Sequence, residues 1–318
     1  MMDRLRTALD SCLRVNLGVK RTETVLVVTD TAKASIGQGF HAAATKLAKE
    51  ALLLIMDPRA VNGEEPPALV AEAMRACDVL LMPTLRSLSH TRARKAASLA
   101  GVRIASMPGI TEEMIKRTFR ADAKVIRKRC RKLCDLLDKG NKVRVVAPSG
   151  TDITFRIEGR KGLGRAGGIY TAPGAWGNLP AGESYIPPLE GKTNGTYVID
   201  TASPLGGMLD RPIQVEVRDG MAVRISGGRQ AKAFDAALRK VGGLAYNIAE
   251  LGIGTNPAAK ITGNILEDEK VYGTAHIALG NSRSFGGRVD VPIHLDGVFR
   301  RPTIWIDDRK IMEKGTLL

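Results

Sequence analysis

The chain contains the apolar run Thr24-Val-Leu-Val-Val-Thr29, and a second run, Ala51-Leu-Leu-Leu-Ile-Met56, follows it after one predicted helix. Both runs have the length of a strand, and neither alternates apolar with polar residues. Continuous apolar strands separated by helices are typical of a parallel sheet that helices cover on both faces. Shorter apolar runs at 79–82 and 102–105 continue this alternation. The sequence therefore predicts an α/β fold for the first part of the chain.

The pattern changes after Gly140. Segments such as 213–217 alternate polar and apolar residues, and glycine-rich turns separate them, which is typical of antiparallel strands. Asp219-Gly220 stands between two such segments and predicts a hairpin. We therefore predict an α/β domain at 1–140, with a parallel sheet and flanking helices, and a mostly antiparallel, β-rich domain at 141–318.

The composition of the 318 residues excludes several classes of protein. With 44% hydrophobic and 25% charged residues, the chain is not disordered, collagen-like or a coiled coil. No apolar run approaches the ~18 residues of a membrane-spanning helix, and the N-terminus lacks the apolar core of a secretory signal. Four cysteines are too few for a disulfide framework. We therefore expect a cytoplasmic protein that does not bind membranes.

The net charge of +15 raises nucleic acid as a partner. Nine basic residues and one acidic residue lie between Lys116 and Lys132, on a predicted helix at about 111–138. Only 4% of the residues are aromatic, however, and no nucleic-acid-binding motif is present. We therefore interpret this helix as a solvated face and expect no specific binding of nucleic acid. A basic binding protein without catalytic activity remains an alternative.

One motif in the first domain, Gly37-Gln-Gly39-Phe-His-Ala42, has the spacing of a dinucleotide-binding loop. In such loops the glycines form the turn that leaves the strand directly, whereas Gly37 lies seven positions after Asp30. We therefore favour a glycine-bearing segment at a packed helix. His41 and His90 have no acidic neighbours in the sequence, and we interpret them as surface or capping residues.

Side chains that can ligate metals gather in the second domain, among glycines, prolines and apolar residues. Carboxylates occur in Asn178-Leu-Pro-Ala-Gly-Glu183, in Ala249-Glu250-Leu-Gly-Ile-Gly-Thr-Asn-Pro257 and in Glu267-Asp268-Glu269-Lys270. Imidazoles occur in Gly273-Thr-Ala-His276-Ile-Ala-Leu-Gly280 and in His294-Leu-Asp296, whose two polar residues share one face of a strand. Charged groups seldom occupy such surroundings unless they are paired or ligating. Mixed imidazole and carboxylate ligands favour zinc, manganese, cobalt or iron.

Taken in order, these motifs resemble those of the aminopeptidase T/aminopeptidase S family of metallo-aminopeptidases, over about residues 170–310. The resemblance implies a homodimer in which each chain binds two ions of zinc, cobalt or manganese. It also implies hydrolysis of short peptides by metal-activated water, with Glu183 or Glu250 as the general base. Carried onto matching positions, the implied metal ligands are Glu183, Glu250, Glu269, His276, His294 and Asp296.

The chain departs from the pattern of this family in three respects. It is shorter, Glu269 and His276 are seven positions apart, and residues 281–284 stand where those peptidases have a tyrosine. A short branch of the superfamily, the 2,5-dihydroxypyridine dioxygenases, uses one non-haem iron ion. For this branch the resemblance implies an Fe(II) triad of His276, His294 and Asp296, and a small aromatic substrate. A metallo-aminopeptidase is therefore our first hypothesis, and a ring-cleaving iron dioxygenase is the alternative.

Overall fold

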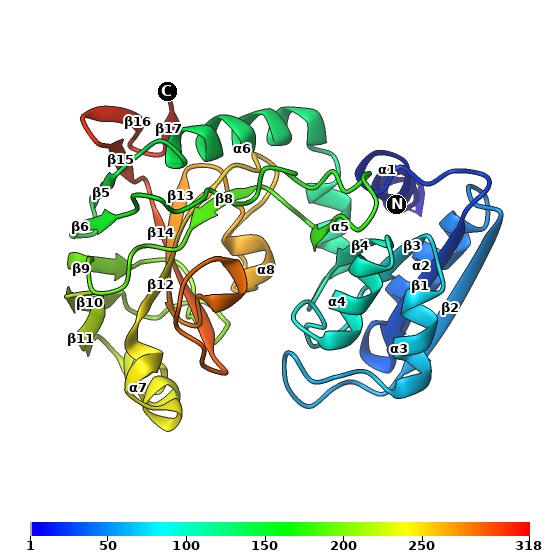
Figure 1. The fold of residues 1–318 in the computed structure, drawn as a ribbon, viewed down its shortest axis with the longest axis horizontal. Coiled ribbons are helices and arrows are strands. Elements are labelled where there is room, and N and C mark those ends of the chain that lie inside the picture. Colours follow the sequence, from blue (N-terminus) through cyan, green and yellow to red (C-terminus); the bar gives the residue numbers. More distant parts are fainter. Residues whose placement is uncertain (1) are drawn as a thin grey trace. The chain divides into compact units, whose positions relative to one another are not determined.

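The computed structural model describes residues 2–318, which divide into two compact units (Figure 1). Unit 1 comprises the residues up to Arg127 together with Gly168–Ala181, and unit 2 comprises Lys128–Gly167 together with Gly182–Leu318. The sequence predicted a single boundary near residue 140. In the structure the chain first crosses between the units at Arg127 and later returns to unit 1 for one short segment.

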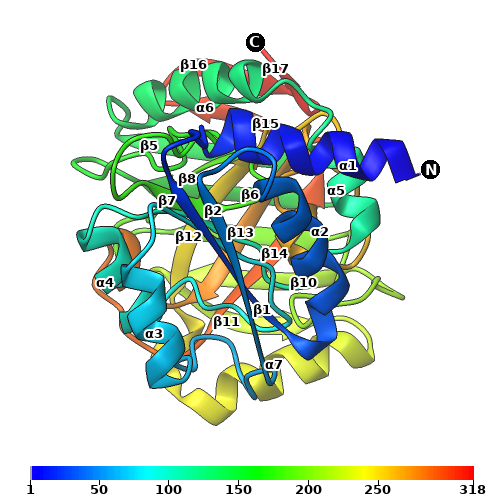
Figure 2. The same cartoon turned by 90° about the vertical axis from the view of Figure 1, so that its right-hand side faces the viewer.

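Unit 1 contains a parallel sheet with strand order β2-β1-β3-β4-β7. Its strands are β1 (Thr24–Asp30), β2 (Glu50–Met56), β3 (Val79–Met82), β4 (Arg103–Ser106) and β7 (Trp176–Asn178). Its helices are α1 (Met2–Ser11), which continues as the π-helix Cys12–Asn16, the short 3-10 helix Thr31–Lys33, α2 (Ala34–Ala44), α3 (Ala68–Arg75), α4 (Arg92–Leu99) and α5 (Glu112–Thr118). Figure 2 shows α3 and α4 on one side of β1 and β2, and α2 and α5 on the other. The predicted α/β fold is therefore confirmed.

Two features of unit 1 show what the local sequence pattern predicts and what only strand pairing decides. Gly37 and Gly39 lie inside α2 and not in the turn after β1, which confirms that their spacing marks a packed helix. A β-carbon at Gly37 would lie 2.6 Å from the methyl group of Thr29, so this glycine allows the helix to approach the strand. Strand β7 was not predicted, because its three residues carry no strand pattern and are recruited only by pairing with β4.

The single basic helix predicted at 111–138 is wrong, because the structure has two helices there. Helix α5 ends at Thr118, and α6 (Ala123–Leu137) begins after a break. Asp122 accepts a hydrogen bond from the backbone N–H of Lys124 at 2.8 Å, which satisfies a donor at the start of α6. None of the helices in the described part of the chain is long and apolar enough to cross a membrane.

Unit 2 contains two antiparallel sheets, with strand orders β11-β10-β9-β6-β5-β15-β16-β17 and β14-β13-β12-β8. The strands of the eight-stranded sheet are β5 (Lys142–Ala147), β6 (Thr151–Arg156), β9 (Asn194–Ile199), β10 (Ile213–Arg218), β11 (Met221–Ser226), β15 (Thr303–Ile306), β16 (Arg309–Glu313) and β17 (Thr316–Leu317). The strands of the four-stranded sheet are β8 (Glu183–Ile186), β12 (Ile248–Gly254), β13 (Thr274–Gly280) and β14 (His294–Arg300). The helices of unit 2 are α6, most of which belongs to it, α7 (Arg229–Val241), α8 (Ile265–Asp268) and the 3-10 helices Gly243–Tyr246 and Arg283–Phe285.

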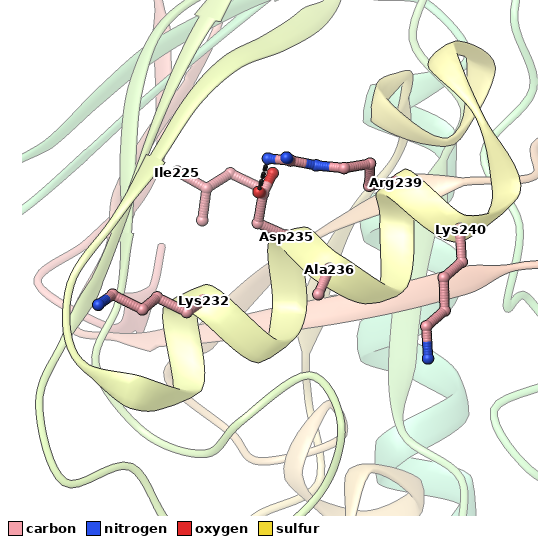
Figure 3. A pocket seen from close by; sticks show the side chains of 6 residues that line it. All are labelled: Ile225, Lys232, Asp235, Ala236, Arg239 and Lys240. Atoms are coloured by element: carbon pink, nitrogen blue, oxygen red, sulfur yellow. Dashed lines mark hydrogen bonds and ion pairs between the residues drawn. The ribbon is translucent and has the colours of Figure 1, made fainter.

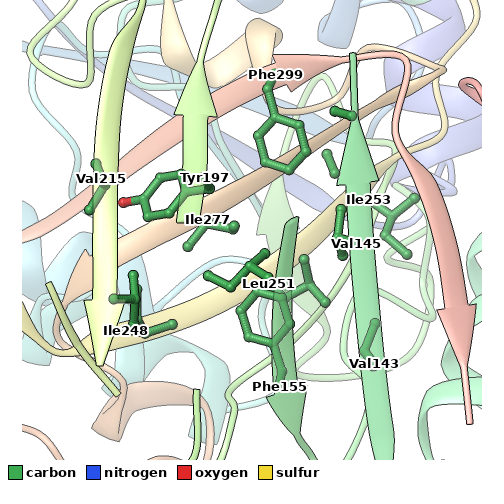
Figure 4. Close-up of a cluster of buried hydrophobic side chains, with 14 of the residues drawn as sticks. Val143, Val145, Phe155, Tyr197, Val215, Ile248, Leu251, Ile253, Ile277 and Phe299 are labelled. Atoms are coloured by element: carbon green, nitrogen blue, oxygen red, sulfur yellow. The ribbon is translucent and has the colours of Figure 1, made fainter. Parts of the chain in front are cut away.

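The core of unit 2 is formed by buried apolar side chains from both of its sheets (Figure 4). Leu251 and Ile253 on β12 and Ile277 on β13 contribute to the same cluster as Phe155 on β6 and Tyr197 on β9. Successive strand residues point to opposite faces of a sheet. The residues between these core positions on β12 and β13 therefore face away from the core, and that other face carries the charged side chains described below.

We predict that Leu251→Ala lowers the free energy of unfolding of unit 2 by about 2–5 kcal/mol, because the side chain is buried in the core and its removal leaves a cavity. Leu244→Ala is the matched control, since Leu244 is 59% exposed, and its effect should stay within about 0.5 kcal/mol. Chemical denaturation of both variants tests this. Equal destabilisation by the two substitutions would contradict the assignment of the core.

Candidate metal centre

The face of the four-stranded sheet opposite the core gathers acidic and imidazole side chains from three adjacent strands. Glu250 on β12 pairs in register with Ala278 on β13, and Ala278 pairs with Asp296 on β14. His276 precedes Ala278 by two residues, and His294 precedes Asp296 by two residues. Side chains two apart on a strand share a face, so these four groups lie on the same side of the sheet.

Two further carboxylates and one ammonium group complete the set. Glu183 begins β8 and pairs in register with Gly254 on β12, which places it on the same face. Glu269 lies at the C-terminal end of α8, and Lys270 follows it. The Nζ atom of Lys270 lies 2.9 Å from Oε1 of Glu183 and also forms an ion pair with Glu269. All six residues that the sequence singled out therefore meet in one place, and with Lys270 we call them the acidic cluster.

A β-bulge decides where Glu250 points. The pairing of β12 with β13 shifts register between Ile248 and Glu250. Ile248 faces the core together with Leu251 and Ile253, and without the bulge Glu250 would share the face of Ile248. An extra residue in a strand turns the following side chains to the opposite face. The bulge thus allows an apolar residue and a carboxylate two positions apart to face opposite ways.

Three groups of ligand atoms within the acidic cluster lie within 4.8 Å of one another, which is close enough to hold one metal ion. They are Glu183–Glu250–His276, Glu250–His294–Asp296 and Glu269–His276–Asp296. Each of these groups has one imidazole and two carboxylates, so the two histidines expected in one triad fall in different groups.

Glu250 belongs to two of the three groups. Its Oε1 lies 3.2 Å from Nε2 of His276, and its Oε2 lies 3.6 Å from Nε2 of His294. One carboxylate therefore links the two imidazoles.

His294 is oriented by a backbone carbonyl. Its Nδ1 donates a hydrogen bond to the carbonyl oxygen of Asn281 at 2.8 Å, which leaves Nε2 to face Asp296 at 3.5 Å. This partner fixes the tautomer and the direction of the ring, as partners of metal-ligating histidines do. Asn281 belongs to the segment in which the tyrosine of the peptidases is missing, so that segment supports the site through its backbone.

Two buried atoms of the acidic cluster make no hydrogen bond within the described residues: Oδ1 of Asp296 and Nδ1 of His276. Buried polar atoms are normally satisfied, and carboxylate oxygen beside imidazole nitrogen is a donor set that suits iron, manganese, zinc or cobalt. The residues present therefore fit a divalent metal ion of this kind.

Electrostatics in the acidic cluster favour charged imidazoles when no metal is bound. Burial lowers the pKa of His276, but its hydrogen bond with Glu250 and the nearby carboxylates outweigh burial and raise that pKa to about 9. Burial is likewise outweighed for His294, where Asp296 and Glu250 raise the pKa to about 10. For Glu269, burial raises the pKa to about 8, although the charge of Lys270 opposes the shift. Metal ligation therefore has to displace protons.

Two residues that position the cluster were not singled out from the sequence. Gly252 on β12 lies opposite His276 in register, and a β-carbon at this position would lie 1.9 Å from Nε2 of His276. Lys270 stood next to a predicted ligand, but nothing in the local pattern distinguished a buried lysine from a solvated one. By contrast, His41 and His90 lie in unit 1 and belong to none of the three groups: His41 contacts the carbonyl oxygen of Ala51, and His90 packs edge-on against Trp176.

A surface pocket on α7 is separate from the acidic cluster (Figure 3). It has a volume of about 430 Å³ and is lined by Ile225, Lys232, Asp235, Ala236, Arg239 and Lys240. The carboxylate of Asp235 is already engaged, since it pairs with Arg239 at 2.6 Å and accepts a hydrogen bond from Tyr246 at 2.8 Å. The pocket shares no residue with the three groups and offers no free carboxylate of its own.

We predict that Gly252→Ala lowers the bound metal content at least several-fold, because the new methyl group displaces His276. Gly243→Ala is the matched control, since a β-carbon there has no atom within 4 Å and the backbone is not in the left-handed region. Elemental analysis of both purified variants, together with circular dichroism to check folding, measures the effect. Full metal content in Gly252→Ala would contradict the role of this glycine.

We predict that metal binding at about pH 7.5 releases protons, because the pKa of His294 is raised to about 10 and a ligating imidazole must lose its proton. Affinity should rise from pH 7 toward pH 10, roughly tenfold per pH unit for each proton released. Titration calorimetry in buffers of different ionisation enthalpy counts these protons. His41→Ala should leave the count unchanged, and an affinity independent of pH would refute the prediction.

Comparison with known proteins identifies what the chain is similar to. Residues 4–318 match the NicX family, described as 2,5-dihydroxypyridine 5,6-dioxygenase. A curated relative, the 2,5-dihydroxypyridine 5,6-dioxygenase of Pseudomonas putida KT2440, is 26% identical over 164 residues. That alignment covers 48% of this chain and 47% of the relative, so it spans about half the length of each.

Two solved structures share the fold. The 2,5-dihydroxypyridine dioxygenase from Pseudomonas putida KT2440 superposes with a TM-score of 0.83 at 21% identity, covering 99% of this chain and 96% of that one. AmpT from Thermus thermophilus superposes with a TM-score of 0.75 at 17% identity, covering 100% of this chain and 99% of that one. At these identities the structural likeness establishes the fold and not the chemistry.

Proposed function

Because the chain belongs to the 2,5-dihydroxypyridine 5,6-dioxygenase family, we propose that it is a metal-dependent dioxygenase that opens a hydroxylated aromatic ring. The observation that carries this proposal is the family match, which extends over residues 4–318. The first hypothesis, a metallo-aminopeptidase, has less support, because among these comparisons only a structural neighbour of 17% identity favours it. The alternative drawn from the sequence is therefore preferred.

Glu250, His294 and Asp296 are the ligands that we propose for the metal. Their ligand atoms lie within 4.8 Å of one another, and none of the three pairs with Lys270. The hydrogen bond from His294 to Asn281 supports this choice, as does the buried Oδ1 of Asp296, which makes no hydrogen bond within the described part of the chain. Fe(II), when bound, would supply the one-electron chemistry that activates O₂.

The remaining residues of the cluster would tune this site. His276 is fully buried, and its Nε2 lies 3.2 Å from Oε1 of Glu250, so it fixes one oxygen of that carboxylate. Lys270 holds Glu183 at 2.9 Å, and the other oxygen of Glu183 lies 3.4 Å from Nε2 of His276. Since Glu250 would ligate the metal, Glu183 is the carboxylate that would accept a proton from a substrate hydroxyl group.

An aromatic pair beside the cluster favours an aromatic substrate over a peptide. Tyr185 shares the face of Glu183 on β8, and its ring lies 5.8 Å from that of Phe285. The Phe285 ring in turn lies 5.5 Å from the imidazole of His294, edge to face. Both aromatic side chains are partly exposed, so a flat ring bound next to His294 would pack against them.

The experiment that tests the proposed activity is anaerobic loading of the apoprotein with Fe²⁺, followed by addition of O₂ and 2,5-dihydroxypyridine. We expect oxygen uptake with loss of the ring absorbance, and no such activity in His294→Ala, which removes one ligand. In the counterpart experiment the apoprotein is loaded with Zn²⁺, Mn²⁺ or Co²⁺, and cleavage of short peptides is assayed. Peptide cleavage without any oxygen uptake would reject the dioxygenase in favour of the hydrolase.

Substitution of Tyr185 tests the substrate class. Tyr185→Leu removes the ring, and we expect it to raise KM for the aromatic substrate by about tenfold, since aromatic contacts are worth about 0.5–1.5 kcal/mol beyond their buried area. Tyr185→Phe keeps the ring and should stay close to the wild type. Steady-state kinetics of the two variants measures the difference. Equal KM values would argue against packing of the substrate ring on Tyr185.

Two expectations about partners also stay proposals. We propose that the chain forms a homodimer, which light scattering after gel filtration tests directly. We also propose that the basic face of α6 is solvated, because Lys128 and Arg131 are exposed while Cys130 and Leu133 beside them are buried. Tight binding of nucleic acid at physiological salt would refute this second proposal.

A further inference from the structure

The segment that follows β13 brings an aromatic side chain to the acidic cluster. We call residues 281–290 the Phe285 loop. The ring of Phe285 lies 5.5 Å from the imidazole of His294 and 5.8 Å from the ring of Tyr185, and it meets both edge to face. The loop contains no β-strand, and its one helical turn is the 3-10 helix Arg283–Phe285. The position of the Phe285 ring therefore depends on the contacts that hold the loop.

Two charged side chains hold the tip of the Phe285 loop by its backbone. Nη1 of Arg160 donates a hydrogen bond to the carbonyl oxygen of Gly286. Oε1 of Glu190 accepts a hydrogen bond from the backbone N–H of Arg288 at 2.7 Å. Nη2 of Arg160 donates to Oε2 of Glu190 at 2.5 Å, which joins the two side chains. Within the described chain, residues 283–288 make no other hydrogen bond to residues outside the loop.

The ion pair between Arg160 and Glu190 is shielded from water. The side chain of Arg160 is 12% exposed, and that of Glu190 is 24% exposed. Partly buried ion pairs are screened by salt much less than exposed pairs, and removal of one partner leaves the other charge without compensation. The planar guanidinium donates to a carbonyl oxygen and to a carboxylate at the same time, whereas a lysine ammonium group has no such fixed fork. The hold on the loop therefore depends on the shape of the arginine as well as on its charge.

The same ion pair connects the chain segments of the two aromatic residues. Glu190 lies four positions after the end of β8, the strand that carries Tyr185. Gly286 directly follows Phe285 in the loop. The ion pair therefore also sets how closely the two rings approach each other, and the proposed substrate ring would pack against both of them.

We propose that Arg160 and Glu190 are positioning residues for an aromatic substrate. They hold the backbone on both sides of Gly287, and they thereby keep the ring of Phe285 beside His294. This inference rests on the proposed function and deepens it. Neither Arg160 nor Glu190 belongs to the three groups of ligand atoms, so loss of the ion pair should weaken binding of the aromatic ring without removing metal.

The test compares Arg160→Ala with the wild type in two measurements on the full-length, Fe²⁺-loaded protein under anaerobic conditions. Hydrogen–deuterium exchange reports on the loop, and we expect peptides that cover 283–289 to exchange several-fold faster in the variant. Titration calorimetry with 2,5-dihydroxypyridine reports on the substrate site, and we expect Kd to rise about tenfold at unchanged iron content. Arg144→Ala is the matched control, since it removes an exposed ion pair with Asp152 from the same unit and should change neither quantity.

Glu190→Gln tests the same contact where Arg160→Ala fails to fold. It removes the charge but keeps an acceptor for the backbone N–H of Arg288, so both changes should appear at smaller size. Unchanged exchange of the loop, or faster exchange with unchanged Kd, would overturn this inference while leaving the proposed function intact. A fall in iron content that accounts for the weaker binding would also overturn it. Failure of the wild type to bind 2,5-dihydroxypyridine would overturn the proposed function and this inference together.

Discussion

Compensation of buried negative charge is the constraint on which the site in unit 2 depends. Glu250 and Asp296 are less than a tenth exposed, and Glu183 and Glu269 are largely buried beside them. Removing a carboxylate from water costs several kcal/mol unless a cation or a hydrogen-bond donor stands close. Lys270 and the two imidazoles meet part of this need, and a divalent metal ion would meet the rest. The raised pKa values of the imidazoles and the lowered pKa of Asp296, where the charge of His294 outweighs burial, have this common cause.

The four-stranded sheet can hold these buried charges together because one of its faces is apolar and the other is charged. One face contributes Leu251, Ile253 and Ile277 to a core shared with the eight-stranded sheet. The apolar contacts on this side hold β12, β13 and β14 in register, and the register decides which side chains meet on the other side. The bulge before Glu250 and the absence of a side chain at Gly252 adapt that register to the acidic cluster. Packing of the core and geometry of the site are therefore two consequences of the same strand pairing.

Similarity to both a dioxygenase and AmpT shows that this scaffold does not by itself determine the chemistry. The arrangement of the candidate ligands in this chain has features of both alternatives drawn from the sequence, a two-metal aminopeptidase and a one-metal dioxygenase. Glu250 links two imidazoles, as a bridging ligand of a two-metal site would. Lys270, however, engages two of the carboxylates that a second ion would need.

The amino-acid sequence alone determined the parallel α/β character of the first part, the antiparallel strands of the second, and the six side chains that gather in the cluster. The strands could be inferred from local periodicity, because continuous apolar runs mark buried strands, and His294 and Asp296 share a face wherever that strand lies. The set of six side chains was implied by the resemblance of their motifs to a known family. Only the tertiary structure decided which imidazole meets which carboxylate, that β7 returns to the first sheet, and that Lys270 is buried between two glutamates. Those features depend on register between strands distant in the chain, and a bulge of one residue is enough to change them.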